Sequence, residues 1–207
     1  MTQTKQHEQD VDVWVGKRFP LTIRRLGVNG HGIGYYKHKV CFVPGALPNE
    51  VVVAEVTRVL PRYLEAKIHR IRKKSRDRVT PRDEYADIAG GFELENLAYQ
   101  QQLKFKRQVI IDSLEKFQPY GYRNYDVRPT IAAPEEYGYR NKAQFQIRMV
   151  NGKVAAGLYQ PNSHTLVDME TCAVQMPRTM ETVRAVTKMI EDLQIPVYDE
   201  KHNSGII

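Results

Sequence analysis

Six histidines and two cysteines are the side chains of this 207-residue chain best suited to metal binding or nucleophilic chemistry. The histidines show no HxH or HExxH spacing, and no CxxC pair occurs. A metal site needs several ligands that converge, and a cysteine nucleophile needs a base or a positive environment. The sequence therefore predicts no metal site of this kind. The residues concerned are His7, His31, His38, His69, His164, His202, Cys41 and Cys172.

Both cysteines are expected to have no catalytic role. Cys41 lies inside the apolar run 40–43, where a thiol is a small buried hydrophobe. Cys172 has no partner that the sequence identifies. The two residues are far apart in the chain and do not suggest a disulfide framework, which fits a reducing cytoplasm. The polar start of the chain, residues 1–12, lacks the apolar core of a signal peptide, and no run of about 18 apolar residues predicts a membrane helix.

The glycine-rich stretch 27–34 allows two interpretations. Its glycines suit a loop that holds phosphate through backbone N–H groups. However, strands follow it, so it matches neither a P-loop nor the strand–GxGxxG–helix turn of dinucleotide-binding proteins. A barrel loop that requires positive φ angles explains the glycines better.

Positive charge is concentrated in residues 17–78. This stretch holds 15 Lys/Arg and four acids, a net charge of +11, whereas the whole chain carries +7 and the remainder therefore sums to −4. Tyr35, Tyr36 and Tyr63 lie among these cations. Cations and aromatic rings together suit a phosphate backbone with exposed bases. The alternative is a solvated basic surface that keeps the protein in solution.

The elements that carry this charge are predicted to be short strands. Apolar runs at 19–23, 40–43 and 51–59 are rich in β-branched residues and are separated by Gly and Pro, which is typical of a small β-barrel. Residues 1–16 are expected to be a polar tail, 17–75 the barrel and 76–207 a second, α+β domain.

Helices and an antiparallel sheet are predicted in the second domain. Apolar residues spaced three, four or seven apart predict a helix over 95–117 whose apolar stripe packs in a core. A β-rich block follows over 127–174, with Asn151-Gly152 as a two-residue hairpin turn. In its first strand Ala143, Phe145, Ile147 and Met149 alternate with polar residues, and this apolar face is expected to be buried. A second helix begins near Pro177 and stops before Pro196.

Three segments resemble known RNA-modifying proteins. Residues 17–71, with Gly32-Ile33-Gly34-Tyr35 and the segment 42–50, resemble a TRAM domain, an RNA-binding barrel. The segment 137–145, which contains Tyr139-Arg140-Asn141-Lys142, resembles the "YRNK" segment of bacterial RNA uracil-5 methyltransferases. Residues 90–106 resemble a helix of the same family. The combination is most similar to the 23S ribosomal RNA uracil-5 methyltransferases.

Many members of that family hold a four-iron cluster through C-x5-C-G-G-C and one later cysteine. The corresponding positions here are Asp83, Ala89 and Phe92, and Cys172 alone remains. A cluster takes four protein ligands, so no iron–sulfur cluster is expected. The family's S-adenosylmethionine fold, its nucleophilic cysteine and its catalytic glutamate would lie beyond residue 207.

The resemblance implies that the chain is the RNA-recognition portion of an S-adenosylmethionine-dependent enzyme that methylates carbon 5 of a uracil in 23S rRNA. The chain alone is expected to be an inactive cytoplasmic monomer that does not bind the cofactor, and helix 95–117 would pack on the catalytic domain. A stand-alone RNA-binding protein and a fragment of a tRNA uracil-5 methyltransferase are the alternatives. The expected RNA-binding residues are Arg24, Arg25, Lys37, Lys39, Arg62, Arg140, Asn141 and Lys142.

Overall fold

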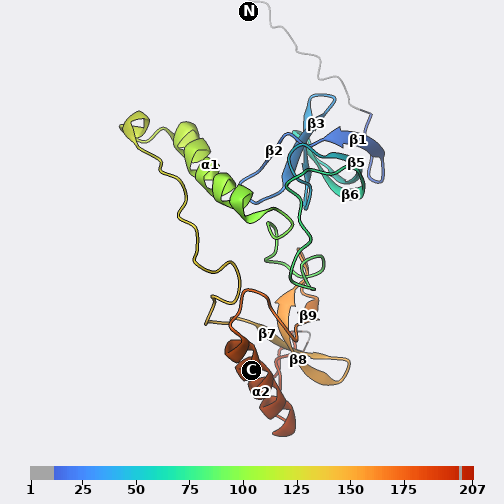
Figure 1. Ribbon diagram of the computed structural model, residues 1–207. Helices are drawn as coiled ribbons and strands as arrows, with labels where there is room; N and C mark the ends of the chain where they lie inside the picture. Colours follow the sequence, from blue (N-terminus) through green and yellow to red (C-terminus); the bar gives the residue numbers. More distant parts are fainter. Residues whose placement is uncertain (1–11, 201) are drawn as a thin grey trace, which may run out of the picture. The chain divides into compact units, whose positions relative to one another are not determined.

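The computed structural model describes residues 12–200 and 202–207 (Figure 1). The chain divides into two compact units, Met1–Arg78 and Val79–Ile207. Within the described residues, no helix has the length and apolar character needed to cross a membrane. The architecture is α+β, as the sequence predicts: a six-stranded sheet comes first, followed by helices and a three-stranded antiparallel sheet.

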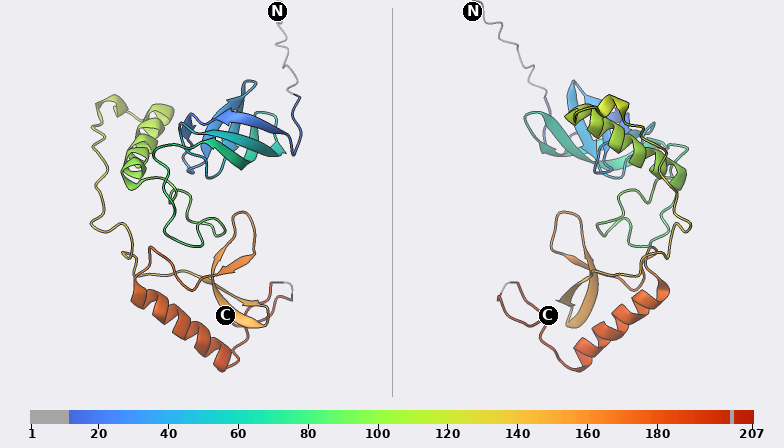
Figure 2. Two further views of the ribbon diagram at one scale, coloured as in Figure 1. Left: turned by 45° about the vertical axis from the view of Figure 1, so that its right-hand side comes forward. Right: turned by 90° about the vertical axis from the view of Figure 1, so that its left-hand side faces the viewer.

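The first unit is a single curled sheet with the strand order β1-β5-β6-β4-β3-β2 (Figure 2). All neighbours are antiparallel except β4 and β6, which run parallel. The three predicted apolar runs correspond to β1, β4 and β5, whereas β2, β3 and β6 were not predicted. The strands are β1 (Arg18–Thr22), β2 (Arg25–Leu26), β3 (Gly32–Tyr36), β4 (Lys39–Val43), β5 (Val51–Val59) and β6 (Tyr63–Lys73).

Two glycines allow the sheet to close on itself. A Cβ atom on Gly34 would lie 2.7 Å from Leu21 Cγ and from the Thr22 carbonyl oxygen, and one on Gly32 would lie 2.6 Å from the Ala46 carbonyl oxygen. Only hydrogen fits there, so β1 can pass against β3. In the glycine-rich stretch, the expected positive φ occurs at Gly30 (80°). Close backbone approach, rather than positive φ, explains Gly32 and Gly34.

The barrel core contains the inward-facing residues of these strands, among them Leu21, Val52 and Leu64. Cys41 is fully buried in it, as predicted, and burial raises the pKa of its thiol to about 12. The thiol is therefore protonated at neutral pH and is not a nucleophile.

The second unit contains two helices and a short meander. Asn151 and Gly152 have φ angles of 52° and 81° and join β7 to β8, so the predicted hairpin turn is confirmed. The strands β8 and β9 pair antiparallel in turn. The elements are α1 (Tyr99–Phe117), the 3-10 helix η1 (Tyr122–Asn124), β7 (Gln146–Val150), β8 (Lys153–Tyr159), β9 (Leu166–Asp168) and α2 (Pro177–Asp192).

Helix α2 begins at Pro177 and ends before Pro196, as predicted. Met180, Thr187 and Ile190 are buried, whereas Val186 is 41% exposed. The buried side of α2 therefore includes Thr187. Its hydroxyl donates to the Val183 carbonyl oxygen, so its burial leaves no hydrogen bond unmade.

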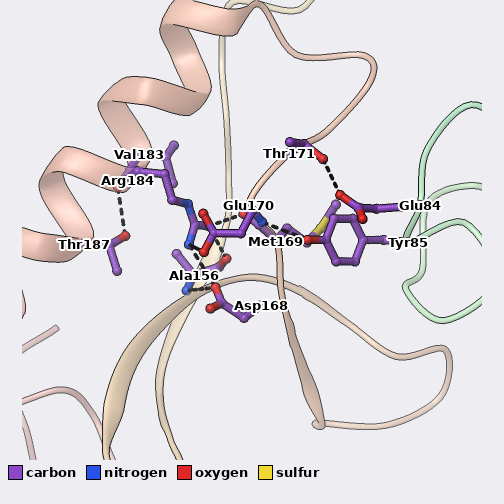
Figure 3. Close-up of polar contacts among 10 residues, drawn as sticks. All are labelled: Glu84, Tyr85, Ala156, Asp168, Met169, Glu170, Thr171, Val183, Arg184 and Thr187. Carbon is purple, nitrogen blue, oxygen red and sulfur yellow. Dashed lines mark hydrogen bonds and ion pairs between the residues drawn. The ribbon is translucent and has the colours of Figure 1, made fainter.

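Arg184 fixes α2 to the sheet (Figure 3). Its guanidinium donates to the carbonyl oxygens of Ala156 on β8 and Met169 after β9, and it pairs with Asp168 at 3.0 Å. The Asp168 carboxylate also accepts from the Ala156 N–H. One cation thus satisfies a carbonyl within β8, the carbonyl that follows β9 and a carboxylate, which holds the helix over the strands.

Two expectations for this unit are wrong. Helix α1 begins at Tyr99 rather than 95 and buries none of its residues, so its stripe is not packed in a core within this chain. The first strand begins only at Gln146, and Met149 is 53% exposed. Both predicted apolar faces are partly covered: Tyr99, Leu103 and Leu114 of α1 are half-buried, and Phe145 before β7 packs against the buried group that contains Ala89 and Cys172.

Candidate nucleic-acid interface

Three of the expected RNA-binding cations lie at one end of the barrel. Lys37 is in the two-residue turn between β3 and β4, with a φ of 44°, and Lys39 begins β4. Because β4 and β6 are parallel and Val40 pairs with Tyr63, Lys39 and Arg62 precede these partners at the same end of the sheet. Lys37 and Arg62 are exposed and Lys39 is half-buried. Residues from two separate turns are thereby brought together.

Arg24 and Arg25 are also exposed, but they lie at the opposite end of β3. Arg25 pairs with Ile33, and the Arg24 N–H donates to the Ile33 carbonyl oxygen at 2.8 Å. Consecutive residues of an extended chain point to opposite faces, so these two arginines do not share one face. Arg25 is in register with the outer face of β3 and β4.

The outer face of the sheet carries aromatic rings. Tyr35, Val40 and Tyr63 are paired across β3, β4 and β6 and therefore project from the same side. Tyr35 is 55% exposed. The Phe42 ring meets Tyr63 edge-on, with 5.4 Å between the ring centroids. We call Tyr35, Val40, Phe42 and Tyr63 the aromatic face.

Tyr36, the third tyrosine of the predicted basic face, is not part of it. Its ring stacks on buried Phe19 with 3.7 Å between centroids and packs against the barrel core. Sequence reasoning grouped Tyr35 with Tyr36 because both lie among cations, and it missed Phe42. The alternation around buried Cys41 was the signal that places Val40 and Phe42 on the outer side.

Two acids of the barrel sheet, Glu55 and Glu65, pair with cations other than Lys37, Lys39 and Arg62. Glu55 pairs with Arg18 at 2.6 Å and with Lys67 at 3.0 Å, and Glu65 pairs with Arg58 at 3.4 Å. The pKa of Glu55 is lowered by its hydrogen bonds with Lys67 and Arg18.

No such ion pair involves the three cations at the barrel end within the described part of the chain. Their charge is therefore available to phosphates.

Glu50 is the one acid buried in the barrel. Its carboxylate accepts from the N–H groups of Leu47 and Ser75, and from Arg78 Nε at 2.7 Å and Nη2 at 2.9 Å. Burial acts to raise its pKa, but the hydrogen bonds and the Arg78 charge prevail and lower it. Arg78 also donates to the Gly45 carbonyl oxygen. This pair fixes the segment that follows β6 against the barrel.

Arg140, Asn141 and Lys142 in the second unit are all exposed. Their backbone is held rather than loose. Arg140 exchanges hydrogen bonds with Val174 and Met176, and the Gln175 amide donates to the Lys142 carbonyl oxygen. The segment before α2 therefore presents this basic segment to solvent in a defined orientation.

Tyr139, which precedes that segment, lines a cleft of about 300 Å³ that the sequence did not indicate. Aromatic and acidic side chains dominate its wall. Burial raises the pKa of Glu95 there, and burial followed by the charge of Glu95 raises that of Tyr137. The lining includes Phe92, Glu93, Glu95, Tyr99, Lys106, Glu135, Glu136, Tyr137 and Tyr139.

Asp83, Ala89, Phe92 and Cys172, at the positions of the cluster cysteines in the family that the chain resembles, lie close together. Ala89 and Cys172 are buried in one apolar group, against which Phe92 packs. The Asp83 carboxylate lies beside them and accepts from the N–H groups of Tyr85 at 3.0 Å and Ala173 at 2.7 Å. Contacts between residues 84–85 and 170–171 close the same region (Figure 3).

This group does not fit an iron–sulfur cluster. Such a cluster needs four thiolate-type ligands, whereas Ala89 and Phe92 provide only carbon. Burial, and then the charge of Asp83, raises the pKa of Cys172, which disfavours the thiolate. No set of three His, Cys, Asp or Glu side chains suitable for a metal was found in the described residues. The region is instead filled by apolar side chains, and the Asp83 carboxylate accepts two backbone hydrogen bonds beside them.

Comparison with known proteins agrees with this architecture. Residues 12–69 match the TRAM domain family. The chain is 63% identical over 205 residues to an uncharacterized RNA methyltransferase of Lactiplantibacillus plantarum, covering 99% of this chain and 43% of the relative. It is 46% identical over 191 residues to one of Enterococcus faecalis, covering 92% and 42%. The chain thus spans less than half the length of the curated relatives it matches.

A solved structure shares the fold. It is the tRNA (uracil-54, C5)-methyltransferase of Pyrococcus abyssi in complex with S-adenosyl-L-homocysteine, with a TM-score of 0.58 and 23% identity. The match covers 89% of this chain and 40% of that one. The likeness therefore extends over both units. The chain carries a TRAM domain followed by a region shared with the N-terminal part of RNA methyltransferases.

Proposed function

We propose that this chain is the RNA-recognition part of an S-adenosylmethionine-dependent methyltransferase that acts on carbon 5 of a uracil in 23S rRNA. The observation that carries the proposal is the 63% identity, across both units, to a protein named as an RNA methyltransferase. The exposed cations of the TRAM barrel support a role in RNA binding. The segment Tyr139 to Lys142 resembles a segment of uracil-5 methyltransferases, and this supports uracil as the target base and carbon 5 as the methylated atom.

The two units divide the work of recognition. The barrel captures the phosphate backbone through Lys37, Lys39 and Arg62, with Arg24 and Arg25 as further contacts. The exposed Arg140, Asn141 and Lys142 orient a particular folded RNA, because hydrogen bonds hold the backbone of Arg140 and Lys142 against the segment before α2. The target uracil must be unpaired or leave its stack before an enzyme reaches carbon 6.

The chemistry is assigned to the remainder of the intact enzyme. The family resemblance implies a cysteine that attacks carbon 6, a methyl group transferred from S-adenosylmethionine to carbon 5, and a base that removes the proton. Neither buried cysteine of this chain suits that attack, because burial raises both thiol pKa values. The two described sheets also lack the doubly wound parallel arrangement that binds nucleotide cofactors.

Helix α1 is proposed to pack on that catalytic part. Its residues are amphipathic in sequence, yet none is buried, and Ile110 and Phe117 are 52% and 72% exposed. Apolar side chains on an amphipathic helix normally cover a core. A partner surface in the longer protein would bury them.

Methylation by the whole protein tests the assignment. The purified full-length enzyme is incubated with tritiated S-adenosylmethionine and unmodified transcripts of 23S rRNA or tRNA, and the labelled base is identified by mass spectrometry. We expect 5-methyluridine in 23S rRNA only. Label in tRNA alone would favour the tRNA enzyme, and tight RNA binding without any label would favour a stand-alone RNA-binding protein.

A further inference from the structure

We infer that the aromatic face of the barrel is a stacking surface for unpaired RNA bases, with Tyr35 and Tyr63 as its two platforms. The inference rests on the proposed function, since it assumes that the barrel binds RNA. It adds the class of RNA: a single strand or loop with accessible base faces, rather than a duplex held by its backbone.

Strand register sets the geometry of the platforms. Tyr35 pairs with Val40, and Val40 with Tyr63, so the two rings flank one small apolar side chain on a common face. Neighbouring strands lie about 4.8 Å apart, which puts the two tyrosine backbones about 10 Å from each other. The residues that alternate with them, Cys41 and Leu64, are fully buried in the core.

The rings are held by the fold rather than by each other. The edge-on contact of Phe42 restrains the Tyr63 ring. Tyr35 follows Gly34, whose lack of a side chain lets β1 pass directly behind β3 and leaves the strand little room to move. A platform fixed in this way loses little conformational entropy when a base stacks on it.

Each tyrosine has a cation close to it in sequence at this end of the barrel. Lys37 follows Tyr35 by two residues in the turn, where its Nζ lies 5.8 Å from the centroid of the Tyr36 ring, and Arg62 immediately precedes Tyr63. A nucleotide therefore meets a ring for its base and a cation for its phosphate at the same end of the barrel. Glu65, the acid in register with Phe42, pairs with Arg58 at 3.4 Å and not with Lys37 or Arg62. This combination matches the stacking platforms and positive tracks of single-strand binding proteins.

A duplex cannot use both features. Its base faces are covered by neighbouring base pairs, so only the phosphates remain for the barrel cations. The aromatic face, with a half-exposed tyrosine beside Val40 and Phe42, would then gain nothing from binding. Charge alone does not require aromatic residues at these two positions.

The test compares tyrosine and cation variants of the full chain. The probes are a fluorescein-labelled 12-mer of uridines, an RNA duplex of the same length, and a 12-mer with abasic sites. The variants are Y35L/Y63L, which keeps apolar bulk but removes both rings, Y35F/Y63F, which keeps the rings, and K37Q/K39Q/R62Q. Y120A is the matched control, because Tyr120 is fully exposed but lies outside the barrel.

We expect Y35L/Y63L to weaken binding of the uridine strand at least about fivefold, with unchanged duplex binding and an unchanged salt slope. The wild type should bind the abasic strand as weakly as Y35L/Y63L binds the uridine strand. Y35F/Y63F should behave as the wild type. K37Q/K39Q/R62Q should lower the salt slope for both probes. Circular dichroism confirms that each variant is folded.

Two results would overturn the inference. If Y35L/Y63L binds the uridine strand as tightly as wild type, or loses duplex binding equally, the rings are not platforms. In that case the RNA-binding proposal survives provided that K37Q/K39Q/R62Q still reduces the salt slope. If neither variant changes affinity for any probe, the barrel does not bind RNA and the proposed function fails as well.

Discussion

Replacing Glu50 with glutamine should destabilise the barrel more than any other single isosteric change in it. The buried carboxylate accepts four hydrogen bonds and donates none. An amide brings two N–H groups, which would face the donors of Arg78 and of the backbone. Breaking a buried ion pair by removing one partner costs about 3–5 kcal/mol. This is a large share of the 5–15 kcal/mol that stabilises a typical domain.

Urea unfolding measures the effect on the barrel alone. Trp14 is the one tryptophan of the chain and belongs to the first unit, so its fluorescence reports that unit. With a slope of about 1 kcal/mol per M of urea, a loss of about 3–5 kcal/mol should lower the E50Q midpoint by about 3–5 M. E65Q is the control, because it removes an exposed pair with Arg58 that is worth about 0–1 kcal/mol. Equal midpoints for E50Q and E65Q would refute the reasoning.

The same pair predicts the acid sensitivity of the barrel. The pKa of Glu50 is lower in the folded state than its ordinary value of 4.5, so the unfolded chain binds more protons near that pH. The contribution of Glu50 is complete above the ordinary pKa and is lost as the pH falls through the lowered one. Wild-type stability should therefore decline below about pH 4.5 more steeply than that of E50Q. Parallel pH profiles would show that Glu50 is not the titrating group.

Three further outcomes are expected. The chain should not bind S-adenosylmethionine, and micromolar binding in calorimetry would contradict this. Protein purified anaerobically should be colourless and free of iron, and stoichiometric iron in the wild type would contradict this. D83C/A89C/F92C, which places three thiols beside Cys172, is the matched positive variant for the iron and sulfide assays. R140Q/K142Q should weaken binding of a ribosomal hairpin more than of scrambled RNA, and equal losses would assign these residues to general phosphate contact.

Much of the fold follows from local chemistry that the sequence displays. Asn151-Gly152 makes a hairpin because both residues tolerate positive φ, and Pro177 starts a helix because it lacks the N–H that a first turn leaves unpaired. The buried state of Cys41 follows from its apolar run. The basic character of the barrel follows from composition alone, since 15 cations and four acids cannot cancel in any fold.

The candidate interface required the tertiary structure. Tyr35 and Tyr36 are adjacent in similar surroundings, and alternation says only that they face opposite ways. The stacking of Tyr36 on Phe19, a residue 17 positions earlier, decides which of them is outside. Likewise, Lys37 and Arg62 lie at the same end of the barrel only because β4 and β6 run parallel. No local sequence pattern predicts that pairing.

The sequence by itself determined the properties that depend on residues near one another, namely turns, helix starts and charge. It also shows Asp83, Ala89 and Phe92 at the positions where the family that it resembles carries cysteines. What only the tertiary structure decided was which distant residues meet. Asp83 and Ala173 are 90 positions apart and share a hydrogen bond, and none of the residues of α1 is buried in the described structure. Burial is a property of the packed chain, whereas periodicity records only the side on which burial is possible.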